Sequence, residues 1–246
     1  MRWRRENAFC KAHEYLKHLH GEPEDLGALW ELQILLLDEI LFQEEKIRSL
    51  KTRLRKSEAS LNSLSRAAAF FIQRRIEECR FWNYVWRCFG DGIAFSYMDR
   101  FALKQTLYNV ENMGPKQGAG FIGGKDGLKH ELDTVASALR DGIPALLTDL
   151  TNTVRHGDVC LMAGPDPILL EAKSGKIIDR RGKKQRKRIH SLHAFFREDF
   201  AQTLRGLKHV RRTEFTVPPV TYLQQINDCI EAANTVGYAT GKPEEG

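Results

Sequence analysis

Apolar residues at helical spacing dominate the first third of the chain. Between Leu26 and Gly90 there is no proline and only one internal glycine, Gly27, and most residues are good helix formers, so long helices are predicted here. Part of this stretch follows a heptad pattern, in which apolar positions alternate in steps of three and four. The seam comprises Ile40, Ile47, Leu50, Leu54, Leu61, Leu64, Ala68 and Phe71, and Gln43 and Ser57 interrupt it. An antiparallel hairpin, a two-chain coiled coil, or an amphipathic helix packed on its own domain would each bury this seam.

The pattern changes after a glycine-rich segment at residues 113–127. A helix is predicted over 128–139, and a second helical stretch after Pro144 runs toward Leu150. Two short apolar runs follow, at 157–163 and 168–173, separated by a turn of glycine, proline and aspartate. They predict a β-hairpin, and strands this apolar are usually central in a sheet.

Near the C-terminus, residues 213–220 are expected to be a strand or an extended connection, and 222–233 an amphipathic helix. We therefore expect a helical oligomerisation or partner-docking region at 1–112, a linker at 113–127, and a second domain at 128–246. The last domain ends in a polar turn just after a helix, which leaves open that further strands are missing from it or belong to another chain.

Composition narrows the class of protein. Hydrophobic residues make up 42% and charged residues 28% of the 246, which is typical of a globular chain and excludes a mostly disordered, collagenous or membrane-embedded one. The five cysteines are odd in number and show no C-x-x-C spacing, so a reducing cytoplasm is favoured over a disulfide scaffold or a structural zinc site. No apolar stretch approaches the ~18 residues of a spanning helix, so no membrane partner is expected.

The glycine-rich segment formally matches a dinucleotide-binding fingerprint at Gly118, Gly120 and Gly123. No apolar strand precedes Gly118, and Asp126 stands where a phosphate-binding loop needs serine or threonine. We therefore favour a flexible linker, which could still gate a substrate groove.

Candidate chemistry is concentrated at the predicted hairpin. Side chains alternate between the faces of a strand, so Glu171 and Lys173 project to one side, and Asp158 opens the partner strand. Two carboxylates and a lysine at the end of a central hairpin are costly to bury for stability alone. Hard oxygen ligands of this kind suit Mg²⁺. A surface ion pair is the alternative, and the same tripeptide pattern occurs by chance at Glu44.

These residues resemble the motif of the PD-(D/E)xK nuclease superfamily, in which Asp158 is followed, after twelve residues, by Glu171, Ala172 and Lys173. The resemblance implies an α/β fold with a restriction-endonuclease-like core, that is, a mixed central sheet flanked by helices, here preceded by a long-helix N-terminal region. It implies that Asp158, Glu171 and the main-chain carbonyl of Ala172 hold Mg²⁺, with Mn²⁺ able to substitute, and that Lys173 activates or stabilises the attacking water.

The family often adds a glutamate from the helix before the sheet, for which Glu131 is the natural candidate and Asp133 the second. Several of its nucleases place a glutamine on the following helix, where Gln185 is similar. Arrangements of this kind are familiar from bacterial antiphage and restriction systems.

A strongly basic run follows Lys173 directly. Such a run indicates a polyanion partner, and its position beside the motif favours nucleic acid over a solvated surface or a localisation signal. The expected phosphate-binding residues are Lys176, Arg180, Arg181, Lys183, Lys184, Arg186, Lys187 and Arg188.

The leading hypothesis is a cytoplasmic, Mg²⁺-dependent endonuclease acting on nucleic acid, DNA in preference to RNA, and forming homo-oligomers or binding a partner protein through its N-terminal helices. The alternative is a catalytically silent subunit of the same fold that binds nucleic acid or scaffolds a larger complex. A structural or regulatory protein is the third hypothesis, and a Rossmann-type enzyme is a distant fourth.

Overall fold

A computed structural model describes residues 2–58, 65–172, 180–213 and 221–241. By their contacts the residues fall into two units, 1–211 and 212–246, so the boundary expected at 113–127 lies inside the first unit. The described part combines long helices with two small antiparallel sheets, which confirms an α/β chain with a long-helix N-terminal region. The second unit contains the helix α7 (Leu223–Val236), as predicted from its amphipathic pattern.

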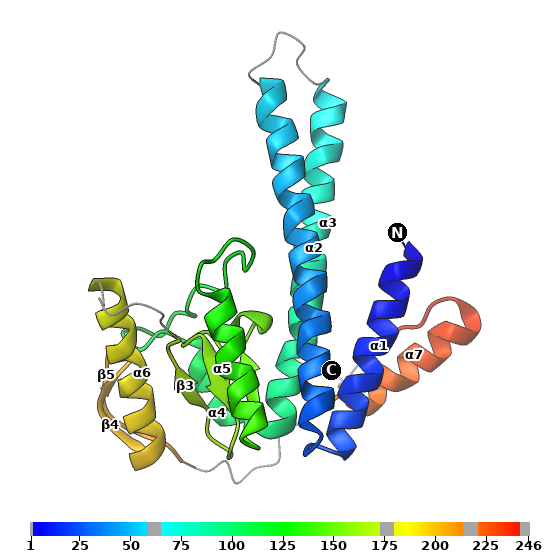
Figure 1. Ribbon diagram of the computed structural model, residues 1–246. Coiled ribbons are helices and arrows are strands. Elements are labelled where there is room, and N and C mark those ends of the chain that lie inside the picture. Colours follow the sequence, from blue (N-terminus) through cyan, green and yellow to red (C-terminus); the bar gives the residue numbers. More distant parts are fainter. Residues whose placement is uncertain (1, 59–64, 173–179, 214–220, 242–246) are drawn as a thin grey trace. The chain divides into compact units, whose positions relative to one another are not determined.

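Three helices form the N-terminal part of the first unit. In Figure 1, α2 (Leu26–Glu58) and α3 (Arg66–Tyr97) run side by side in opposite directions, and α1 (Arg2–Gly21) packs against both. The antiparallel hairpin is thus the arrangement that buries the heptad seam on α2, where Ile40 and Ile47 are inaccessible to solvent. The single register expected to continue to Phe71 is wrong on α3, because the chain reverses direction and Phe71 is 62% exposed.

A three-stranded sheet follows the short helix α4 (Arg100–Leu107) and the helix α5 (Leu128–Arg140). Its order is β1 (Ala145–Leu147), β2 (Val159–Leu161), β3 (Ile168–Leu170), and both neighbouring pairs are antiparallel. The predicted hairpin is confirmed as β2 and β3, with β2 central. The helix expected after Pro144 is wrong, since this stretch forms β1 and a 3₁₀ turn, η1 (Thr148–Leu150).

Side chains from two helices satisfy the outer edges of this sheet. Gln33 of α2 donates from Nε2 to the carbonyl of Ala145 (3.0 Å) and accepts at Oε1 from the amide of Leu147 (2.9 Å), as a neighbouring strand would. On the other edge, Nε2 of His193 accepts from the amide of Leu169 (2.9 Å). Accepting there requires a neutral imidazole, and burial lowers the pKa of His193, which favours that form.

The last part of the first unit is the helix α6 (Arg180–Glu198) and a two-stranded hairpin, β4 (Phe200–Leu204) and β5 (Leu207–Arg211). Helix α6 packs on β3 and β4, while α5 packs on β1 and β2. A mixed sheet is expected from the family resemblance, whereas both sheets of the described residues are antiparallel.

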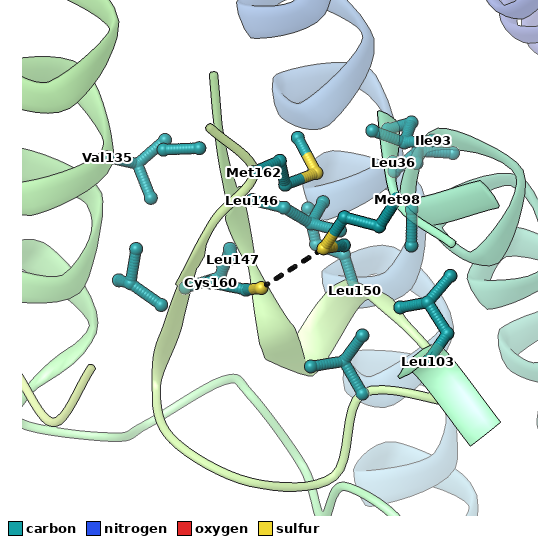
Figure 2. Close-up of a cluster of buried hydrophobic side chains, with 14 of the residues drawn as sticks. Leu36, Ile93, Met98, Leu103, Val135, Leu146, Leu147, Leu150, Cys160 and Met162 are labelled. Carbon is teal, nitrogen blue, oxygen red and sulfur yellow. Dashed lines mark hydrogen bonds between the residues drawn. The ribbon is translucent and has the colours of Figure 1, made fainter. Parts of the chain in front are cut away.

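One hydrophobic core joins the helical pair to the sheet. Figure 2 shows Leu36 and Ile93 of the long helices in one cluster with Leu146 of β1, Cys160 of β2 and Met162, which directly follows β2. Sγ of Cys160 lies 3.8 Å from the sulfur of Met98. The helical pair can approach closely because α3 has a glycine at the contact: a Cβ at Gly90 would lie 1.9 Å from the carbonyl oxygen of Leu150. The helices therefore support the sheet directly.

No helix in the described part of the chain has the length and apolar character needed to cross a membrane.

Candidate active site at the ends of the hairpin strands

The candidate site forms where β2 begins and β3 ends. The amide of Asp158 donates to the carbonyl of Leu170 (2.7 Å), and Oδ2 of Asp158 accepts from the amide of Ala172 (3.0 Å). These two bonds hold the Asp158 carboxylate against the segment that carries Glu171. The sequence-based expectation that Asp158 and Glu171 lie at adjacent strand ends therefore agrees with the described geometry.

Gly157 makes this approach feasible. Its φ of +76° lies in the left-handed region, and a Cβ there would meet the carbonyl oxygen of Leu170 at 2.7 Å. Thr148, directly after β1, holds the same backbone from the β1 side. Its amide donates to the Asp158 carbonyl (3.0 Å), and its Oγ1 donates to the Gly157 carbonyl (2.8 Å). Both neighbouring segments thus fix the backbone of Asp158.

Glu131 contributes a third carboxyl group from the first turn of α5. It is 7% exposed, and its Oε2 has no hydrogen-bond partner among the described residues. Burial and then the nearby Asp158 raise the pKa of Glu131 to about 7, with further contributions from Asp149 and Glu171 against an opposing one from Lys125. Glu131, the helix glutamate expected from the resemblance, therefore lies where the negative charges of Asp158 and Glu171 act on it, whereas Asp133 is exposed.

A lysine that the sequence analysis assigned to the linker also belongs to this region. Lys116 is half-buried, and burial together with the positive charge of Arg188 lowers its pKa, while Glu171 and Asp158 oppose this shift. Its Nζ donates to the carbonyl of Arg155, whose guanidinium donates back to the Lys116 carbonyl. The signal that could have found it is weak, since a single lysine among glycines has no periodicity.

The glycine-rich segment around Lys116 is tied to the helical pair. The buried carboxylate of Glu44 on α2 accepts from the amides of Ile122 (2.9 Å) and Gly123 (2.8 Å). Arg87 of α3 donates to the carbonyls of Gly120 (3.2 Å) and Asp149 (2.9 Å). The segment expected to be a flexible linker is therefore anchored along its second half, and Glu44, dismissed as a chance motif match, is one of its anchors.

The basic run is only partly described. Lys173 and Lys176 lie outside the described residues, and for Arg180 and Arg181 the helical backbone alone is described. Lys183, Lys184, Arg186 and Lys187 are exposed on the first half of α6, and Gln185 is half-buried there without a side-chain hydrogen bond to another described residue.

Arg188 differs from the rest of the run. It donates to both carboxylate oxygens of Glu111, from Nε at 3.2 Å and from Nη2 at 2.5 Å, and Lys184 approaches the same carboxylate at 3.6 Å. The guanidinium of Arg188 is thus held at the side of the site where Lys116 lies, whose pKa it lowers.

His156 is a structural residue. It is inaccessible to solvent, and its Nε2 bonds to the carbonyl of Tyr108 (2.9 Å), which requires the tautomer that carries the proton on this nitrogen. Burial, followed by the charge of Lys116, lowers the pKa of His156 to about 4. The ring is therefore neutral at physiological pH.

Among the described residues, no three side chains of histidine, cysteine, aspartate or glutamate are grouped closely enough to hold a metal ion. The site expected from the resemblance is smaller, with two carboxylates and one main-chain carbonyl. Burial, followed by the negative charge of Asp158, raises the pKa of Glu131, and a divalent cation beside these carboxylates would offset that negative charge. The residues present fit a hard cation in this respect.

Comparison of the chain with family models, with curated proteins and with solved structures gives no match. The assignment of function therefore depends on the residues and their geometry.

Proposed function

We propose that this protein is a metal-dependent nuclease that hydrolyses the phosphodiester bonds of DNA in preference to those of RNA. The supporting observation is the hydrogen bond from the Ala172 amide to the Asp158 carboxylate (3.0 Å), which brings Asp158 next to Glu171 at the ends of two paired strands. Glu131, with its pKa raised to about 7, adds a third carboxyl group to the same negative field.

In this proposal Asp158, Glu171 and the carbonyl of Ala172 bind Mg²⁺ or Mn²⁺. The ion would supply Lewis-acid stabilisation of charge on the phosphate. Lys173, which lies outside the described residues, would orient the attacking water or offset charge in the transition state. Glu131 can hold or release a proton near neutral pH, because its pKa lies at about 7.

The exposed basic residues of α6 give the proposal its substrate class. Lys183, Arg186 and Lys187 have no ion pair with another described residue, so their charges are available to the phosphates of a nucleic acid. Contacts of this kind bind the backbone without specifying sequence. The order of a glutamate-bearing helix, paired strands with the carboxylates, and a basic helix with Gln185 supports a restriction-endonuclease-like core and, by resemblance, a role in antiphage defence.

A cleavage assay tests the proposal directly. Purified protein is incubated with plasmid, linear duplex, single-stranded DNA and RNA in the presence of Mg²⁺, Mn²⁺ or EDTA. We expect metal-dependent cutting that is lost in Asp158→Asn, Glu171→Gln and Lys173→Ala. The matched control is Asp141→Asn, which removes an exposed carboxylate at the far end of α5 and should cut as the natural protein does.

Binding separates a nuclease from a silent subunit. The affinity for duplex DNA should fall steeply with added salt, and it should fall further in a Lys183→Ala, Lys187→Ala double variant. Binding without cutting under either metal would favour the silent subunit, and binding insensitive to both salt and the double variant would refute the nucleic-acid assignment.

A further inference from the structure

The end of the helical pair that lies farthest from the sheet is a two-helix arm with a small core of its own. We define the arm as residues 46–58 of α2 and 66–80 of α3, which extend beyond the sheet in Figure 1. Its core is separate from the main one and comprises Ile47, Ile72, Ile76 and Cys79, with Leu50 and Leu54 packed against them. The apolar faces of the two helices therefore cover each other, and the remaining residues determine what the arm presents to solvent.

The arm is strongly basic. It contains ten lysine and arginine residues and three glutamates, so its excess of positive charge is larger than the net charge of +6 of the whole chain. Several of its exposed basic side chains have no ion pair with another described residue, namely Arg53, Arg55, Lys56, Arg66 and Arg74. Positive charges gathered on two neighbouring helical segments repel one another, and a polyanion that neutralises them removes this repulsion.

A hollow of about 570 Å³ opens on one side of the arm. Its lining includes the apolar side chains of Leu54 and Ile76, the Phe70 ring, which is 58% exposed, and the cations of Lys51 and Arg74. Pockets that hold small organic molecules have volumes of about 300–1,000 Å³, so the hollow has room for a planar ring and its substituents. The hollow thus combines an aromatic surface with positive charge.

The positive charge in the hollow is only partly neutralised within the chain. Nη1 of Arg80 pairs with Glu77 (2.6 Å), whereas neither Lys51 nor Arg74 has an ion pair with another described residue. The ammonium of Lys51 lies 5.6 Å from the centroid of the Phe121 ring, which is itself 37% exposed. A second aromatic ring, from the glycine-rich segment, therefore borders the same cation. A ligand that matches this surface carries flat rings joined by negative charges.

We propose that the arm binds single-stranded nucleic acid, with one base against the Phe70 ring in the hollow and the neighbouring phosphates on Lys51 and Arg74. Aromatic rings that stack on bases, together with cations that hold the backbone, bind single strands with little regard to sequence. The bases of a duplex are stacked on one another, so their faces cannot reach Phe70. The arm is an addition to the α6 surface, and the proposal does not rest on the nuclease assignment of the carboxylates.

The distribution of apolar side chains favours nucleic acid over an anionic membrane. A helix that lies in a membrane surface buries a continuous apolar face among the lipids. In the arm the apolar faces are packed between the two helices. Among the described residues of the arm, Phe70 and Phe71 are the only large apolar side chains that remain exposed. Two adjacent rings among cations provide stacking surfaces for bases but no apolar face to insert into lipid.

Fluorescence anisotropy tests the stacking contact, with a labelled oligothymidylate of about 12 nucleotides and EDTA to prevent cutting. Lys183→Ala and Lys187→Ala are present throughout, so that binding by α6 contributes little. In this background we expect Phe70→Ala to weaken binding about tenfold, because one stacked base is lost. Phe95→Ala, which removes a ring that is 50% exposed on α3 outside the arm, should leave the affinity unchanged. No loss in Phe70→Ala, or an equal loss for a duplex of the same length, would overturn the proposal.

The salt dependence of binding tests the two cations. Lys51→Gln together with Arg74→Gln should lower the slope of log affinity against log salt concentration by about 1.4, since each phosphate contact of a single strand contributes about 0.7. The matched control, Lys17→Gln together with Arg140→Gln, removes two exposed positive charges outside the arm and should keep the slope of the natural protein. The same slope in both double variants would refute the role of the arm.

Photo-cross-linking of the natural protein locates the bound base without relying on how the variants fold. An oligothymidylate that carries 5-iodouracil should be recovered on the peptide that contains Phe70. Cross-links confined to α6, or binding of anionic phospholipid vesicles without binding of the oligonucleotide, would overturn the proposal. The two proposals can fail separately: cutting without the Phe70 cross-link would refute the arm alone, and the cross-link without cutting would leave the arm supported and count against the nuclease.

Discussion

His156 should make the stability of this protein fall in mild acid. The ring is fully buried, its Nε2 donates to the carbonyl of Tyr108 (2.9 Å), and its Nδ1 has no hydrogen-bond partner among the described residues. Protonation would put a buried positive charge near the ammonium of Lys116, the second cause that lowers the pKa of His156. The folded state therefore keeps the neutral ring to lower pH than the unfolded chain does.

The size of the effect follows from the two pKa values. The pKa of His156 is about 4 in the folded protein against 6.5 for a free imidazole. Because the folded value is lower, the contribution is complete above pH 6.5 and is lost as the pH falls toward 4. A shift of this size corresponds to about 3 kcal/mol of the free energy of unfolding.

Urea unfolding between pH 8 and pH 4 measures this contribution. His156→Gln keeps a donor for Tyr108 but removes the titrating ring, so its free energy of unfolding should fall by about 3 kcal/mol less than that of the natural protein over the same range. His13→Gln, which removes an exposed imidazole from α1, distinguishes the loss of the buried ring from the loss of any histidine. Equal pH profiles for the natural protein and His156→Gln would refute the reasoning, as would equal flattening by both variants.

Three further predictions concern the site and its supports. Gly157→Ala should cost more stability than Gly142→Ala in thermal unfolding: both have positive φ, at +76° and +77°, but only at Gly157 does a Cβ meet backbone, so a similar loss at both would contradict the close approach. Burial raises the pKa of Glu131, so its contribution to stability, opposite in sign to that of His156, should be lost as pH rises from 4.5 through about 7; over this range the free energy of unfolding of Glu131→Gln in urea should therefore rise more than that of the natural protein, and parallel profiles would contradict this. The buried Glu44 carboxylate accepts hydrogen bonds from two backbone amides, and Glu44→Gln replaces one of the two acceptor oxygens by a donor, so it should destabilise the fold by about 3 kcal/mol. Glu45→Gln, at a side chain that is 72% exposed, should change the urea midpoint little.

The sequence predicted those parts of the molecule in which local pattern and tertiary contact agree. Helix α5 and the β2–β3 hairpin were found because their apolar periodicity and turn residues are local signals. The placement of Asp158 beside the Glu171 segment followed from strand pairing alone. Glu131 was found through the resemblance to a family motif, since a single acid on a helix carries no signal of its own.

Other parts depend on distant contacts and could not be predicted locally. The run after Pro144 contains good helix formers, yet it becomes β1 because it pairs with β2 and because Gln33 satisfies its other edge. Lys116 was missed because distant contacts hold it: its amide donates to the carbonyl of Leu107 (2.8 Å) and its ammonium to that of Arg155, and the charges of Glu171 and Asp158 act on it there. The β4–β5 hairpin was missed as well, although the glycine at the second position of its two-residue turn, Gly206, was a sequence signal. In the structure Arg205 and Gly206 both have positive φ, at 56° and 81°, as a type I′ turn requires.

The satisfied edges of the three-stranded sheet have a consequence for self-association. An open strand edge recruits strands from other molecules and is a common origin of aggregation. Here the Gln33 amide occupies one edge at β1, and the His193 ring caps Leu169 on the other. Protonated His193 could no longer accept the Leu169 amide bond, so acidification would expose that edge. Intermolecular β-sheet, seen as a new amide I band in infrared spectra, should therefore form more readily in acid, and His193→Lys should show it already at neutral pH.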